Sequence, residues 1–187
     1  MTSVLNTQKV PGLVAGNWVI DPSHSEVSFS VRHLMVSKVR GTFETFSGAL
    51  TIRDNLLDSS VEASVDMNSI NTREVNRDNH LRTKDFFEVA KYPQMTFQST
   101  SIRPHSGDYI LVGDLTIKGV TREVEFELEF NGVNSSPMGT RAGFSAQTEI
   151  NRNDYGVDIQ MPLDGGGVVV GEKVKILLEV EAVLQNA

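Results

Sequence analysis

Hydrophobic and polar residues alternate along most of this chain. In segment 24–33, Val27, Phe29 and Val31 occupy one face, and polar residues occupy the positions between them. A repeat of two residues is typical of a β-strand that buries one face. The same pattern predicts further strand segments at 17–21, 39–54, 60–70, 94–103, 108–118, 121–133, 138–151 and 172–184.

Two local features refine this pattern. The alternation slips between Phe43 and Phe46, which predicts a bulge that bends the strand. Residues 118–120 are few enough for a hairpin turn, so the strands on either side of them are expected to pair antiparallel. About eight strands with hairpin-length connections suit a closed antiparallel barrel or a sandwich, and the length of the strands favours the barrel.

One helix is expected, over residues 71–83. Asn71 and Glu74 have the spacing of a capping box. Segment 84–93 then has apolar side chains, including Phe86 and Phe87, which are expected to point into an apolar environment. We interpret the insert 71–97 as a cover over one end of the barrel, with a polar lip.

Composition limits the classes of function. The chain has 187 residues, enough for one domain, and a net charge of −7, which argues against a nucleic-acid-binding protein. Cysteine is absent, so disulfides and thiolate sites are excluded. We expect a flexible arm at 1–16 and a barrel domain at 17–187. No apolar run suggests a signal peptide or a membrane span, so we expect a cytoplasmic protein without stable membrane insertion.

A barrel with an apolar inner face can be hollow or filled by its own side chains, and the alternation of residues alone is consistent with both. Several residues expected to face inward are small: Ala49, Ala63, Gly113 and Ala146. Small side chains would leave free volume inside an eight-stranded barrel, which can hold one small ligand.

Metal and catalytic motifs are weak in this chain. The four histidines, His24, His33, His80 and His105, lack the close ligand pairs of zinc sites, so no metal site is expected. Asp21, Ser23 and His24 stand together, but a catalytic triad is defined by geometry and not by proximity along the chain. We expect turn roles for the serines beside Pro22, and no catalytic residue.

The glycine-rich segment 164–171 does not have the spacing of a dinucleotide-binding loop and does not open a helix. A flexible hairpin, or a hinge at the barrel rim, is the expected role.

The predicted helix carries cations. Arg73, Arg77, His80 and Lys84 would form one stripe if the helix continued through them. This stripe could bind an anion. It could also be a solvated face balanced by Glu74, Asp78 and Asp85. In a third interpretation, Arg77, Asp78 and His80 form a hydrogen-bond cluster that anchors the insert.

Several blocks of sequence resemble one known family. WVIDPSHSEVSFSVRH, GTFETFSGAL, RDNHL, DFF, YP, LTIKGVT and NRNDYGVD occur in this order. Together they resemble the YceI family of lipocalin-like proteins, over residue 16 to about residue 184. The resemblance implies an all-β, extended eight-stranded antiparallel lipocalin-like barrel with one short inserted helix. It also implies a pore that holds a long-chain isoprenoid or similar amphiphile, such as a polyprenyl phosphate, an isoprenoid quinone or a fatty-acid-like molecule, and a possible homodimer.

The expected function is therefore that of a non-enzymatic lipid carrier or storage protein without a cofactor. Many members of the family carry a signal peptide, and its absence here favours an intracellular role. The alternatives are an enzyme that acts on such a lipid through His80 and Asp78, and a stress-related interaction protein. The expected ligand-binding residues are Val27, Phe29, Val31, Phe46, Met67, Leu81, Phe86, Phe87, Phe97, Leu115, Phe126, Leu128 and Phe144, with Arg77, Asp78 and His80 at the mouth.

Overall fold

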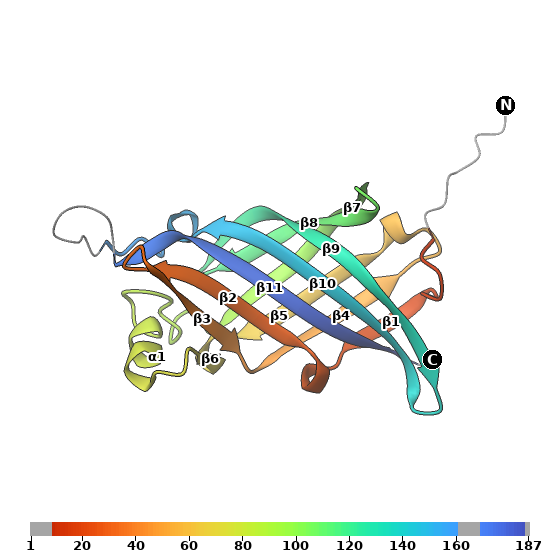
Figure 1. Ribbon diagram of the computed structural model, residues 1–187, viewed down its shortest axis with the longest axis horizontal. Helices are drawn as coiled ribbons and strands as arrows, with labels where there is room; N and C mark the ends of the chain where they lie inside the picture. Colours follow the sequence, from red (N-terminus) through yellow and green to blue (C-terminus); the bar gives the residue numbers. More distant parts are fainter. Residues whose placement is uncertain (1–8, 161–168, 186–187) are drawn as a thin grey trace.

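In the described part of the chain, eleven strand segments form one antiparallel sheet that closes on itself (Figure 1). The structure is a computed structural model and describes residues 9–160 and 169–185. The segments are β1 (Gly16–Ile20), β2 (Glu26–His33), β3 (Ser37–Phe43), β4 (Phe46–Ile52), β5 (Ser60–Asp66), β6 (Ile70–Asn71), β7 (Gln94–His105), β8 (Asp108–Ile117), β9 (Val120–Ser136), β10 (Gly139–Asn151) and β11 (Val170–Leu184).

Three pairs of these segments each form one strand of the barrel that is interrupted by a short break. β11 pairs with β10 on one side, and with both β1 and β2 on the other. On their other side, β1 pairs with β4 and β2 pairs with β3. In turn, β4 pairs with β5 and β3 pairs with β6. Counting β1–β2, β3–β4 and β5–β6 as one strand each reduces eleven segments to eight. The eight-stranded antiparallel barrel expected from the sequence is confirmed.

The break between β3 and β4 lies where the sequence predicted a bulge. Residues Glu44 and Thr45 leave the strand. The Glu44 amide donates to the carbonyl of Ser69, and the Thr45 carbonyl accepts from the Asp66 amide. The expected single strand over 39–54 is therefore two segments, β3 and β4, whose freed backbone groups bond to the neighbouring strand. The other two breaks are short 3₁₀ helices, η1 (Pro22–His24) and η3 (Met67–Ser69).

The helix α1 spans Val75–Leu81 and is shorter than expected. Glu74 caps it, because its carboxylate accepts from the amides of Asn76 and Arg77 at 3.1 and 2.6 Å. The side chain of Asn71 instead accepts from the Arg73 amide at 2.8 Å. The predicted capping box is therefore wrong. Arg73 has a φ of +66°, in the left-handed region, so the helix cannot extend back through it.

Two further 3₁₀ helices lie at opposite ends of the barrel. η2 (Leu56–Asp58) joins β4 to β5, and η4 (Arg152–Tyr155) follows β10. Figure 1 places α1 and the turns β2–β3 and β8–β9 at one end, which we call the helix end. The turns β7–β8 and β9–β10 lie at the other end, which we call the far end.

Inward side chains form two hydrophobic clusters that succeed one another along the barrel. Of the small residues expected to face inward, Ala63 and Ala146 line the interior. At Gly113 an added Cβ would come within 2.5 Å of the Phe97 ring, so this ring fills the space that the glycine leaves. Leu50 and Ile52, not Ala49, line the interior from β4. The interruption at Glu44 and Thr45 explains why an alternation counted from β3 gives the wrong face there.

Candidate ligand channel

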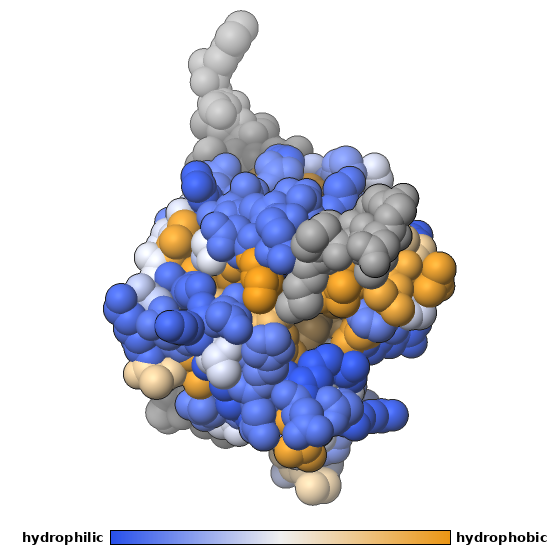
Figure 2. Space-filling model, turned by 90° about the vertical axis from the view of Figure 1, so that its left-hand side faces the viewer, coloured by the Kyte–Doolittle hydropathy of each residue, from blue (hydrophilic) through white to orange (hydrophobic). Residues whose placement is uncertain are grey.

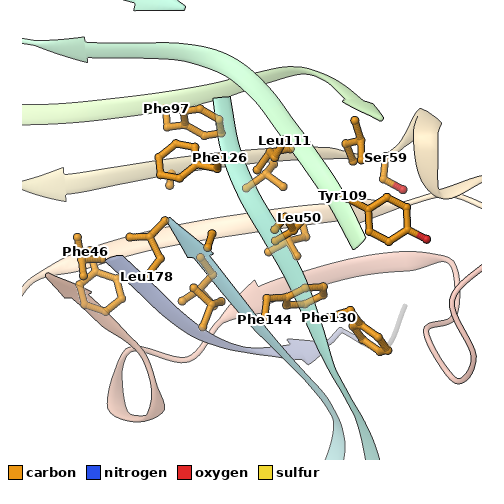
Figure 3. A pocket seen from close by; sticks show the side chains of 18 of the residues that line it. Phe46, Leu50, Ser59, Phe97, Tyr109, Leu111, Phe126, Phe130, Phe144 and Leu178 are labelled. Carbon is orange, nitrogen blue, oxygen red and sulfur yellow. The ribbon is translucent and has the colours of Figure 1, made fainter. Parts of the chain in front are cut away.

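The larger of the two cavities inside the barrel lies in its far half and has a volume of about 150 Å³. Side chains from strands all around the barrel converge on it, as Figure 3 shows for Phe46, Phe97, Phe126 and Phe144. Phe97 and Phe126 meet edge to face with ring centroids 5.3 Å apart. This cavity, the far chamber, presents an almost wholly apolar wall.

The second cavity lies at the helix end and has a volume of about 100 Å³. Its wall includes Leu81 from α1 and Phe86 and Phe87 from the connection to β7. In the segment after α1, the amides of Phe86 and Phe87 donate to the carbonyls of Thr83 and Leu81. These local bonds fix the turn of the segment, and its two phenylalanines form part of the wall of this helix-end chamber.

The two chambers share wall residues. Val27, Met95 and Ile176 line both of them. The chambers are therefore adjacent along the barrel, with these three side chains between them, and we call the two together the channel.

The structure brings together all thirteen apolar residues that the sequence analysis selected. The far chamber is lined by Phe46, Phe97, Leu115, Phe126, Leu128 and Phe144. The helix-end chamber is lined by Phe29, Val31, Met67, Leu81, Phe86 and Phe87. Val27 lines both. Contact of these residues with a ligand stays a prediction.

Arg77 and Asp78 lie outside both chambers and converge on Thr72. Asp78 is 8% exposed, and its carboxylate accepts from the amide of Thr72 at 2.9 Å and from its hydroxyl. The Arg77 guanidinium donates to the Thr72 hydroxyl and carbonyl, each at 2.8 Å. These bonds fasten α1 to the end of β6, which is the anchoring role considered for the helix.

His80 does not join this cluster. Its Nε2 lies 3.1 Å from a carboxylate oxygen of Asp85, and its ring meets Phe86 edge to face. Since α1 comprises only Val75–Leu81, Arg73 and Lys84 lie outside it and the expected cationic stripe does not form. Arg77, Asp78 and His80 line neither chamber, and their position at the mouth stays a prediction.

Sequence reasoning missed two wall residues that precede β1. Val10 and Leu13 line the far chamber, although residues 1–16 were expected to be a flexible arm. The Trp18 indole, which is fully buried, donates to the carbonyl of Val14 at 3.2 Å. Two apolar side chains three positions apart were too short a pattern to reveal this contact.

Arg152 was also missed, although it belongs to the recognised block NRNDYGVD. It is 6% exposed, and its guanidinium donates to the carbonyls of Gly171, Val157 and Val170 at 2.9, 2.7 and 3.3 Å. Burial lowers the pKa of this guanidinium from its ordinary value. Arg152 thus ties η4 to the start of β11 at the wall of the helix-end chamber.

Tyr155 is a further missed residue in the wall of the helix-end chamber. It is 2% exposed, and within the described ranges its hydroxyl has no hydrogen-bond partner. Burial raises its pKa to about 12, because the phenolate would lose its hydration.

We expect Tyr155→Phe to raise the free energy of unfolding by about 1 kcal/mol, since it removes a buried hydroxyl that has no partner among the described residues. The raised pKa adds a pH dependence. The unfolded state ionises this tyrosine near pH 10 and the folded state only near pH 12, so the wild type loses stability as the pH rises from 10 towards 12. Urea titrations at pH 8 and pH 11 should show a larger gain for the variant at the higher pH. A less stable variant at pH 8 would contradict this account.

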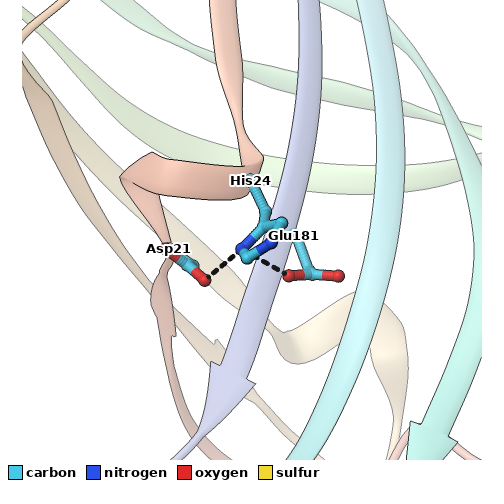
Figure 4. A group of neighbouring side chains, drawn as sticks. All are labelled: Asp21, His24 and Glu181. Atoms are coloured by element: carbon cyan, nitrogen blue, oxygen red, sulfur yellow. Dashed lines mark hydrogen bonds and ion pairs between the residues drawn. The ribbon is translucent and has the colours of Figure 1, made fainter.

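A polar cluster on the outer wall joins η1 to β10 and β11. Figure 4 shows Asp21, His24 and Glu181 in contact. The side-chain atoms with which these residues could bind a metal ion lie within 4.8 Å of one another. Arg141 already supplies a cation there, since one guanidinium nitrogen lies 2.8 Å from Asp21 and 2.7 Å from Glu181. The Ser23 hydroxyl, followed by Arg141 and His24, holds the pKa of Asp21 far below its usual range. The cluster is thus a closed ion-pair group that spans the break between β1 and β2.

The same geometry rules out a triad of Asp21, Ser23 and His24. The Nδ1 atom of His24 lies 2.8 Å from the Asp21 carboxylate and 3.1 Å from the Ser23 hydroxyl. In a triad the two partners face opposite nitrogens of the ring. Here both face one nitrogen, so the ring cannot pass a proton between them.

Of the glycine-rich segment 164–171, residues 164–168 lie outside the described part of the chain. Gly171 lies in β11, where its carbonyl accepts from Arg152. The hinge expected at this segment stays a prediction.

The fold and its interior define a lipocalin-like β-barrel with an internal apolar channel. The model of the YceI-like domain matches residues 18–182, and the chain belongs to this family. A UPF0312 protein of Staphylococcus epidermidis is 41% identical over 169 residues, which are 89% of this chain and 96% of that protein.

Solved structures agree. The YCEI protein of Campylobacter jejuni gives a TM-score of 0.70 at 28% identity, over 83% of this chain and 90% of that one. A polyisoprenoid binding domain from Saccharophagus degradans gives 0.70 at 16% identity, over 90% and 98% of the two chains. Within the described ranges, no helix has the length and apolar character to cross a membrane.

Proposed function

We propose that this protein binds one long-chain isoprenoid or similar amphiphilic lipid inside the barrel, as a carrier or storage protein. The observation that carries the proposal is the junction of two apolar chambers at Val27, Met95 and Ile176. A chain that runs through both gains about 0.8 kcal/mol for each CH₂ group it buries. The S. degradans domain, named for polyisoprenoid binding, supports this class of ligand.

The proposal is tested by titrating delipidated protein with a prenyl alcohol, an isoprenoid quinone and a fatty acid, using displacement of a fluorescent lipid probe. Saturable one-to-one displacement by at least one of them is the expected result. Protein that binds neither the probe nor any of the three would refute the proposal.

We also propose that the barrel binds without catalysing a reaction. The two residues of the enzymatic alternative, Asp78 and His80, bond to Thr72 and Asp85 and line neither chamber. A general acid or base must come within hydrogen-bond reach of the reacting group.

We therefore expect His80→Ala to leave lipid affinity unchanged and to lower stability by about 1 kcal/mol, since it removes an exposed pair with Asp85 and an edge-to-face contact with Phe86. Asp78→Ala should cost about 2 kcal/mol, because the buried amide of Thr72 loses its acceptor. Thermal unfolding and probe displacement measure both effects. A product formed from bound lipid by the wild type, and not by His80→Ala, would favour the enzyme instead.

The carrier role, the cytoplasmic location and the homodimer stay predictions. Cell fractionation and sedimentation of the purified protein test the last two.

A further inference from the structure

The turn between β2 and β3 exposes three apolar side chains in succession. Leu34, Met35 and Val36 are 40, 52 and 82% exposed. Leu34 and Met35 also have φ angles of +50° and +62°. Hairpin turns in this region of φ favour Asn, Asp or Gly. The chain thus accepts both backbone strain and exposed apolar surface at this tip, a combination that indicates a functional contact.

The tip lies beside the helix-end chamber. The Leu34 amide donates to the carbonyl of Val169 at 2.9 Å, and Val31 and Val170, in the two strands that continue from this contact into the barrel, line the chamber. Figure 1 places the tip and α1 at the same end, and Figure 2 shows hydrophobic surface around a hollow there. Val75, in α1, is 72% exposed at this end as well.

Basic residues flank the tip, and no acidic residue lies near it in the sequence. Between Glu26 and Glu44 the chain has no Asp or Glu, but it has Arg32, Lys38 and Arg40. Arg32 and Lys38 are directly opposite each other in the β2–β3 ladder. Within the described ranges neither forms an ion pair. Like charges in opposite positions destabilise a sheet unless an anion lies near them.

A surface groove continues this positive region onto β11. Arg32, Met35 and Lys38 line it together with Lys173 and Lys175. Glu149 and Glu172 line it too, and Glu149 pairs with Lys173 at 3.8 Å. Since the whole protein carries a charge of −7, a negatively charged surface would repel most of it and attract this region.

We propose that the tip of residues 34–36 docks the helix end onto an anionic phospholipid bilayer. The apolar side chains enter the interfacial region, and Arg32 and Lys38 face the lipid phosphates. Apolar insertion combined with basic residues is the physical basis of reversible surface binding. Docking would turn the helix-end chamber towards the bilayer, so that a lipid could pass between the two. This last step rests on the proposed function.

The test is flotation of the purified protein with vesicles of phosphatidylglycerol and phosphatidylcholine, and with vesicles of phosphatidylcholine alone. The wild type should float with the first and much less with the second. Met35→Asn/Val36→Ser should lower binding about tenfold, since Asn suits the left-handed turn and the fold is kept. Arg32→Gln/Lys38→Gln should lower binding to the anionic vesicles by about thirtyfold.

Matched controls lie elsewhere on the barrel. Met138, 84% exposed in the turn at the far end, provides the apolar control Met138→Ser, and Arg53, exposed in the β4–β5 connection, provides Arg53→Gln. Both should float like the wild type. The proposal is overturned if the wild type does not bind anionic vesicles, if the controls lose as much binding as the tip variants, or if sedimentation shows that the tip joins two copies of the chain. Lipid titration without vesicles separates this result from the proposed function, since the tip variants should keep their affinity for lipid.

Discussion

Replacing Val27 by Trp should abolish binding of long-chain isoprenoids and spare that of short ones. Val27 lines both chambers, and an indole at this position would separate them. A chain confined to one chamber buries fewer CH₂ groups. The loss of four of them costs about 3 kcal/mol, which is roughly a 200-fold loss of affinity. Competition of a prenyl alcohol of eight isoprene units and of a ten-carbon fatty acid against a fluorescent probe measures the two effects.

Val19→Trp is the matched control, because Val19 lies in β1 and is 42% exposed on the outer face. It should bind both competitors like the wild type. If Val27→Trp kept its affinity for the long chain, the two chambers would not serve as one channel.

Replacing Arg152 by Met should lower the free energy of unfolding by about 3 kcal/mol. The guanidinium bonds to three backbone carbonyls, and each lost bond costs about 1 kcal/mol. For a chain of this length the melting temperature should fall by about 6–12 °C. Arg152→Lys should recover less than half of this loss, since an ammonium group cannot match the planar fork.

Arg103→Met serves as the comparison for Arg152. Arg103 pairs with Glu125 at 3.0 Å on the surface, with both side chains about half exposed. Such pairs contribute between about 0 and 1 kcal/mol. Equal losses in the Arg103 and Arg152 variants, measured by chemical denaturation, would contradict the anchoring role of Arg152.

The wall of the channel could be predicted because strand alternation is a local property. Once Val27, Phe29 and Val31 share a face, the closed sheet puts that face inside. Where a strand is interrupted, the alternation no longer predicts which side chains face inward. At Glu44 and Thr45 the backbone turns to bond Ser69 and Asp66, which lie more than twenty residues away, so the local pattern carries no sign of it.

The polar residues were harder to place, because their partners come from distant segments. Arg152 bonds to the carbonyl of Gly171, and a carbonyl acceptor is present at every position in the chain. Asp78 was selected for its charge, but its role follows from the position of Thr72 at the end of β6. The start of α1 followed from the positive φ of Arg73, a conformation that an arginine in the sequence does not indicate.

The central claim is that one lipid chain occupies the joined chambers. Native mass spectrometry of the protein, purified without detergent, tests it most directly. We expect a single adduct with the mass of a long-chain isoprenoid or similar amphiphile on the wild type, and its loss from Val27→Trp. Wild-type protein that carries no adduct, and still carries none after incubation with a lipid extract, would contradict the claim.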